Sequence, residues 1–142
     1  MSEYFAMSCS NGNIDKVREI MSRLDFKSSW ITSKNSFHNM YQESGLYYAC
    51  VMGHFEIVKL LLEHVDIIPI VCLIAILLPI EKDKDNYLKI IKLLFKHGKF
   101  DREIPKWLFL VTENSYFNNQ LKTLFDEYTF RIDGPKYNEN II

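Results

Sequence analysis

The chain has few cysteines and no excess of charge of either sign. Its three cysteines, Cys9, Cys50 and Cys72, are odd in number, widely spaced and set among apolar residues. This pattern argues against a disulfide framework or a paired-cysteine zinc site and favours a reducing, intracellular compartment, the cytoplasm or the nucleus. Seventeen basic residues against eighteen acidic ones create no global field that would collect nucleic acid. We therefore expect no nucleic-acid partner.

No stretch of the chain is long and apolar enough for a membrane span. The longest uncharged run, from Ile67 to Ile80, has fourteen residues, whereas a spanning helix needs about 20. Pro69 and Pro79 bracket this run, so it predicts a short, fully buried helix and no membrane partner. The start of the chain lacks the basic and apolar segments of a secretory signal.

Signatures of catalysis and metal binding are also missing. The sequence has no glycine-rich phosphate loop and no Gly-x-Ser-x-Gly nucleophile elbow. No two of its four histidines have the i, i+4 spacing with a carboxylate that a helical zinc site uses. We therefore expect neither an enzyme nor a metal or other cofactor.

What the sequence does contain is a compact domain with an internal repeat. Its 142 residues are 48% hydrophobic and 25% charged, a composition that excludes disorder and collagen. Residues 57–64 align with residues 90–97 with five of eight identities, at an offset of 33. A period in this range indicates stacked helix pairs. Each copy has a broad apolar face and a polar stripe at helical spacing.

A second, longer offset relates the N-terminus to the first copy. Cys9 lies three positions before Gly12, as Cys50 lies three positions before Gly53. Glycine accepts the left-handed conformation that ends a helix. The frame of the unit is therefore repeated, with a short insertion between the two copies.

Residues 45–62, Gly-Leu-Tyr-Tyr-Ala-Cys-Val-Met-Gly-His-Phe-Glu-Ile-Val-Lys-Leu-Leu-Leu, resemble an ankyrin repeat. The usual run of that family is Thr-Pro-Leu-His-x-Ala-Ala-x-x-Gly-His-x-Glu-Ile-Val-x-x-Leu-Leu. The unit before it resembles a capping repeat. The unit after it keeps the second helix but lacks the Gly-His turn, with Pro69 as the helix-opening proline. A weaker pair over 104–111 and 117–128 would close the stack.

The resemblance implies an all-α, ankyrin-like solenoid of about four helix pairs. It would occupy residues 1–130 as one domain, followed by a frayed tail over 131–142. Proteins of this family are non-enzymatic and bind other proteins through the concave row of first helices and through the loops between repeats. The implied role is that of an intracellular adaptor or inhibitor with a protein partner, acting as a monomer.

Carried over residue by residue, the resemblance places partner contacts at particular positions. The variable positions between the small pair and the glycine are Val51 and Met52 in the second unit and Ser10 and Asn11 in the first. Tyr48 shares the same concave side. Val51 and Met52 are apolar where solvent-facing residues are usually polar; they either contact a partner or pack against the enlarged neighbouring loop.

The insertion over 25–44 offers a further contact, Trp30. Aromatic residues on a projecting loop are typical interface anchors, but Trp30 and Phe37 could instead fold back over the thin N-terminal unit.

Two other functions remain open. One is a block that self-associates or stacks on another subunit through Trp107, Phe109 and the 67–80 helix. The other is a peripheral membrane or host-interfering factor that uses the same apolar helix.

Overall fold

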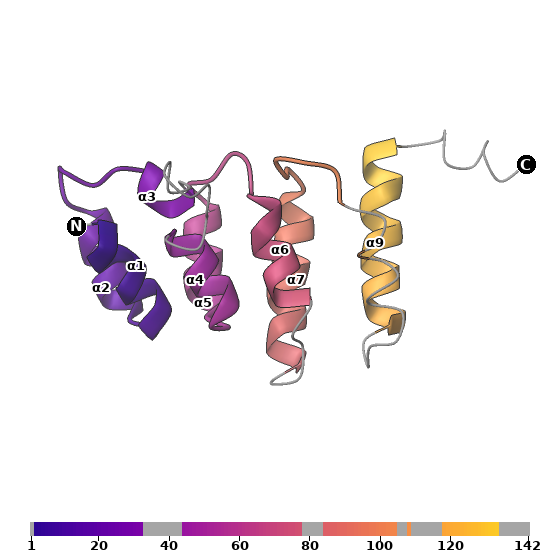
Figure 1. The fold of residues 1–142 in the computed structure, drawn as a ribbon, viewed down its shortest axis with the longest axis horizontal. Coiled ribbons are helices and arrows are strands. Elements are labelled where there is room, and N and C mark those ends of the chain that lie inside the picture. Colours follow the sequence, from indigo (N-terminus) through magenta and orange to yellow (C-terminus); the bar gives the residue numbers. More distant parts are fainter. Residues whose placement is uncertain (1, 33–43, 78–83, 105–107, 109–117, 134–142) are drawn as a thin grey trace, which may run out of the picture.

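The structure, a computed structural model, describes residues 2–32, 44–77, 84–104, 108 and 118–133. Within these ranges it is a stack of helices without a β-sheet, which confirms the all-α fold. Three helix pairs and a final helix follow one another along the stack (Figure 1). The elements are α1 (Ser2–Asn11) with α2 (Ile14–Met21), the short α3 (Ser29–Thr32), α4 (Gly45–Val51) with α5 (Phe55–Leu62), α6 (Ile70–Leu77) with α7 (Lys84–His97), and α9 (Asn118–Asp133).

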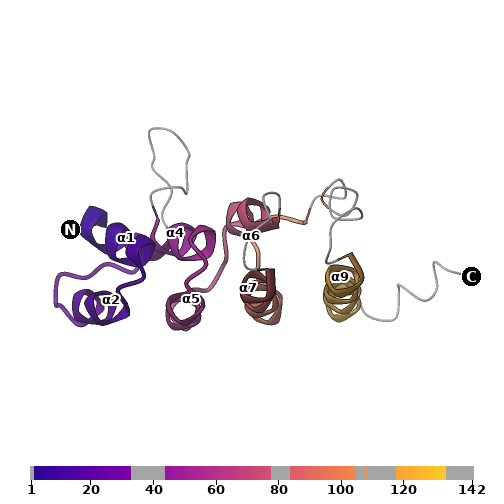
Figure 2. The same ribbon diagram turned by 90° about the horizontal axis from the view of Figure 1, so that it is seen from below.

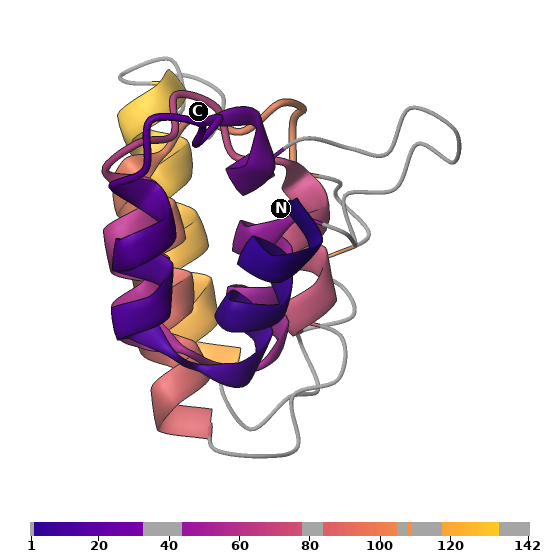
Figure 3. The ribbon, with the colours of Figure 1, turned by 90° about the vertical axis from the view of Figure 1, so that its left-hand side faces the viewer.

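The helices form two rows. Figure 2 shows the first helices α1, α4 and α6 in one row and the second helices α2, α5, α7 and α9 in the other. The view along the stack in Figure 3 separates the same rows into two columns. This is the expected solenoid of helix pairs, in which each unit buries its apolar stripe against its neighbours.

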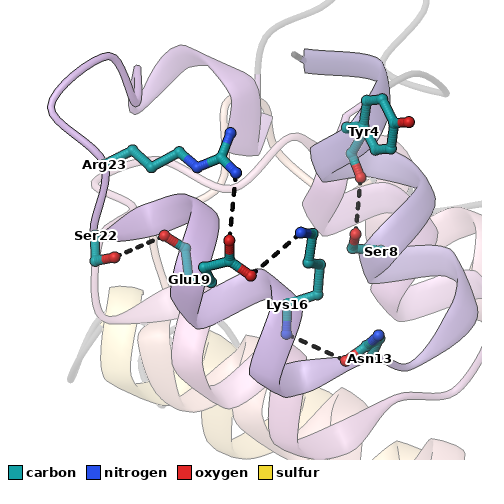
Figure 4. Close-up of polar contacts among 7 residues, drawn as sticks. All are labelled: Tyr4, Ser8, Asn13, Lys16, Glu19, Ser22 and Arg23. Atoms are coloured by element: carbon teal, nitrogen blue, oxygen red, sulfur yellow. Dashed lines mark hydrogen bonds and ion pairs between the residues drawn. The ribbon is translucent and has the colours of Figure 1, made fainter.

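The helix boundaries follow from local sequence. The Asn13 side chain accepts a hydrogen bond from the Lys16 amide at the start of α2 (Figure 4), and the Ser44 side chain accepts one from the Tyr47 amide at the start of α4. Such caps satisfy amides that have no partner within the helix. Gly12 and Gly53, both at φ +77°, then turn the chain from the first helix of a unit into the second.

The core repeats with the units. Cys9 and Cys50, which occupy equivalent positions relative to the two glycines, are both fully buried, as are Val17 and Val58. A side chain at Gly45 would collide with the ring of Phe5, so the missing Cβ lets α4 approach α1 closely. The small and apolar positions that suggested a repeat are therefore the positions that pack the units together.

The apolar run over 67–80 is only partly the fully buried helix expected from its sequence. Its helix starts at Ile70, directly after Pro69, whose missing amide costs nothing at a helix start. Ile67 is 55% exposed, and Val71, Ile74 and Ala75 are half-buried. These last three are spaced i, i+3, i+4, so one stripe of α6 lies at the edge of the stack. The expectation of complete burial was wrong because apolar composition does not say which face has a neighbour.

The turns between paired helices are joined from unit to unit. His54 Nε2 lies 2.8 Å from the Ser10 carbonyl oxygen, and because a carbonyl only accepts, Nε2 is the donor. The Tyr87 hydroxyl donates in the same way to the Val51 carbonyl at 2.6 Å. Under the two repeat offsets, Tyr87 is the equivalent of His54 and Val51 is the equivalent of Ser10. The third unit therefore keeps the contact although it lacks the Gly-His turn.

Glycine is required where these donors approach. A Cβ on Gly12 would lie 2.6 Å from His54 Cε1, and one on Gly53 would lie 3.0 Å from Asn86 Nδ2. The side-chain amide of Asn86 also donates a hydrogen bond, from Nδ2 to the Gly53 carbonyl, at 2.6 Å. Each position thus requires glycine for two reasons: the backbone has a positive φ, and a side chain of the next unit lies too close for a Cβ.

The opposite end of the third unit is also cross-linked by hydrogen bonds. Ile68 and Phe100 form a parallel β-bridge, in which the Ile68 amide donates to the Lys99 carbonyl at 2.7 Å and the Asp101 amide donates to the Ile68 carbonyl at 2.9 Å. The Asp101 carboxylate accepts from the Ile70 amide at 2.8 Å and so caps α6. His97 Nε2 donates to the Val65 carbonyl at 2.6 Å.

The last helix is attached through aromatic rings. Phe95 of α7 packs against Phe125 and Tyr128 of α9 with ring centroids 5.1 and 5.3 Å apart, and Phe100 lies 5.8 Å from Tyr128. Leu108, in the segment expected to form the first helix of this unit, is buried; the rest of 105–117 lies outside the described residues. Helix α9 continues to Asp133, past the expected start of the tail at 131.

The turn contact of the third unit can be tested with a matched pair of variants. Replacing Tyr87→Phe removes the hydroxyl that donates to Val51 and is expected to lower the free energy of unfolding by about 1 kcal/mol. Tyr48→Phe removes a hydroxyl for which the described residues provide no hydrogen-bond partner and is expected to change it by less than about 0.5 kcal/mol. Urea unfolding followed by circular dichroism measures both; equal effects would contradict the role given to Tyr87.

Candidate protein-binding face

The outward sides of α1, α4 and α6 carry little charge, and together we call them the first-helix face. On each helix a set of solvent-accessible side chains is spaced i, i+3, i+4 and therefore shares one side: residues 7, 10 and 11, residues 48, 51 and 52, and residues 71, 74 and 75. These three helices contain one charged residue, Glu3. The helices of the other row are more highly charged: α5 carries Glu56 and Lys59, and α2, α7 and α9 each carry at least four charged residues. The residues of the face are Met7, Ser10, Asn11, Tyr48, Val51, Met52, Val71, Ile74 and Ala75.

Three of the contact residues expected from the sequence lie together here. Tyr48 and Val51 are half-buried on one stripe of α4, and Met52, 52% exposed, follows at the end of the helix. The ring of Tyr48 packs edge-on against Tyr47, with centroids 5.9 Å apart. The Val51 carbonyl is used by Tyr87, while its side chain faces outward with Tyr48.

The corresponding positions of the first unit extend the same surface. Ser10 is half-buried and Asn11 is exposed. Met7, which was not among the expected contacts, is 59% exposed. It precedes Gly12 by the same interval as Tyr48 precedes Gly53, so the alignment of the two glycines would have identified it.

Trp30 is not placed on this face. Its ring is half-buried and packs against Phe26, with centroids 5.4 Å apart, and against Phe5, at 6.5 Å. Ile31 beside it is fully buried. This part of the 25–44 insertion covers the N-terminal unit, which is one of the two interpretations that the sequence left open for Trp30. Phe37, like the rest of 33–43, lies outside the described residues.

The ion pairs of the N-terminal unit lie on α2 and directly after it. Glu19 lies between Lys16, at 3.2 Å, and Arg23, at 3.3 Å (Figure 4). The hydrogen bond from Lys16, followed by that from Arg23, holds the pKa of the Glu19 carboxyl below its ordinary value. These groups are solvent-exposed, so the pairs add little to stability.

The three cysteines are buried in the first-helix row and have the properties of inert core thiols. Burial raises the pKa of the Cys9 thiol from 9.0 to about 12. The pKa of Cys72 is raised by a hydrogen bond with Cys50 and by burial. The reactive form of cysteine is the thiolate, so the raised pKa values make Cys9 and Cys72 poor nucleophiles at neutral pH. Within the described ranges no three His, Cys, Asp or Glu side chains are grouped to hold a metal ion.

Comparison with known proteins identifies the second unit. Residues 41–69 match the family model of the ankyrin repeat. No match was found among curated proteins or among solved structures. Residues 41–69 therefore resemble one ankyrin repeat, and the helix pairs stacked on both sides of them are consistent with a divergent ankyrin-like protein. In general, ankyrin repeats are protein-interaction modules.

The apolar helix α6 has eight residues. In the described part of the chain, no helix combines the length and the apolar character needed to cross a membrane.

The raised thiol pKa values predict a fall in stability at high pH. Below pH 9 the Cys9 thiol is protonated in both the folded and the unfolded states; above it the thiol ionises in the unfolded chain, whereas in the folded protein it does so only near pH 12. The free energy of unfolding should therefore decrease as the pH rises from 9 toward 12.

The variant Cys9→Ala isolates this contribution, because tyrosines and lysines titrate in the same range. Denaturant titrations at intervals across that range should show a smaller decrease for the variant than for the wild type. If both proteins lose the same amount of stability, burial does not shift the Cys9 pKa as stated.

Proposed function

We propose that this protein is a non-enzymatic, intracellular interaction module, an adaptor or inhibitor, that binds a protein partner through the first-helix face. The observation that supports this proposal most strongly is the difference between the two rows. A solvent-facing surface made of Met7, Tyr48, Val51, Met52 and the α6 stripe is apolar, whereas the second helices carry the charges that surfaces normally have.

The chemistry of the face indicates the kind of contact. Tyrosine supplies a large contact area with few rotatable bonds, and methionine adapts to irregular partner surfaces. Because the face has almost no charge, binding should depend on apolar burial and shape. The complex should therefore persist when the salt concentration is raised from about 0.1 M to about 1 M.

The proposal is tested by a double variant, Tyr48→Ala with Met52→Glu. Both side chains are solvent-accessible, so the variant should fold, as verified by circular dichroism and thermal melting. Partner capture from a lysate, quantified by mass spectrometry, should fall at least about tenfold, since truncation of a central aromatic residue and a buried charge each cost more than about 1 kcal/mol.

The matched control is Lys59→Glu, an equally drastic change at an exposed position of α5 in the same repeat. It should retain the partner. If wild type, double variant and control all capture the same proteins equally, the first-helix face is not the binding surface. If the only captured protein is a second copy of this chain, the self-stacking function replaces the adaptor.

A further inference from the structure

A second surface lies on the opposite row, between α7 and α9. It is a groove with a volume of about 760 Å³. Its floor is formed by Phe95, which is 3% exposed, with the half-buried Leu124 and Tyr128. The two helices stand side by side in Figure 1, and the groove extends along α9 from Gln120 to Tyr128, about 12 Å at the helical rise.

The floor of the groove is part of the aromatic cluster that attaches α9 to α7. The Phe95 and Tyr128 rings lie 5.3 Å apart, and Phe95 is also 5.1 Å from Phe125. Two helices with an apolar floor between them form the kind of site that accepts the apolar side of a third helix. A length of about 12 Å corresponds to some two turns of such a helix.

The two rims carry opposite charges. On the α7 side Lys92 and Lys96 line the groove, and Lys89 continues the same exposed stripe. Lys89 is also placed over the Phe55 ring, 5.9 Å from its centroid. On the α9 side the charged lining residue is Glu127. Lys92 has no ion-pair partner among the described residues, so its charge is available to a ligand.

From this arrangement we propose that the α7–α9 groove binds an acidic amphipathic helix of a protein partner. Apolar side chains of that helix cover Phe95, Leu124 and Tyr128. Its acidic side faces Lys92 and Lys96, and its less acidic side faces Glu127. The positive rim selects an acidic partner, because a basic helix bound in the same position would place its own positive charges next to Lys92 and be repelled. This site is separate from the first-helix face and does not depend on the function proposed for it.

The test uses two designed helical peptides that share one stripe of leucine and phenylalanine. Along one side of the stripe, one peptide carries glutamates and the other carries lysines, and the opposite side of the stripe is uncharged in both. Fluorescence anisotropy with the full chain should show at least about tenfold tighter binding of the glutamate peptide, with an affinity that falls as salt is added. Equal affinity for both peptides, or no binding of either, would overturn the proposal.

Two pairs of variants locate the binding. Lys92→Glu should weaken the glutamate peptide about tenfold, whereas Lys59→Glu, at the equivalent position of the preceding unit, should not. Gln120→Trp places a large ring in the groove and should abolish binding; Lys122→Trp, on an exposed side of α9 that does not line the groove, should not. Circular dichroism checks that all four fold. Unchanged binding to Gln120→Trp would show that the groove is not the site.

Other occupants give different results. If Tyr48→Ala with Met52→Glu abolishes peptide binding, the peptide uses the first-helix face, and the groove proposal fails while the proposed function stands. If sedimentation of the protein alone reveals a dimer that Gln120→Trp dissociates, a second copy occupies the groove and the acidic partner is excluded.

Discussion

The contact that fixes the stack is the hydrogen bond from the start of one unit's second helix to the turn of the unit before it. His54 reaches the Ser10 carbonyl and Tyr87 reaches the Val51 carbonyl. Each bond is worth only about 1 kcal/mol, but a helix pair cannot bury its apolar stripe alone. The bond sets the register in which neighbouring stripes meet, and the glycines at φ +77° leave room for the donor.

Because the units stack in this register, the first helices line one side of the molecule and the second helices line the other (Figure 2). The second helices meet water with charged stripes, while the first helices present methionine, tyrosine and aliphatic side chains. The two proposed modes of recognition use this one architecture: an apolar surface insensitive to salt on one row, and a groove with a basic rim on the other. The thiols lie within the first-helix row and take part in packing alone.

Much of this arrangement was predictable from the sequence where residue identity is retained. The two repeat offsets located α2, α4, α5 and α7, and the family model confirmed the repeat at 41–69. The contact made by Tyr87 was not predicted, because the third unit has a tyrosine at the position where the second unit has His54. The exposed stripe of α6 was missed because an all-apolar helix has no pattern to mark its outer side. The α7–α9 groove depends on the spacing of two units, which no local pattern encodes.

The most direct test of recognition through the first-helix face is site-specific photo-cross-linking with benzoylphenylalanine in place of Met52 or of Lys59, performed in cells that express the chain. These positions lie on opposite rows of the same repeat. We expect a partner adduct from position 52 and little or none from position 59. Adducts of equal yield from both positions, or from position 59 alone, would contradict recognition through this face.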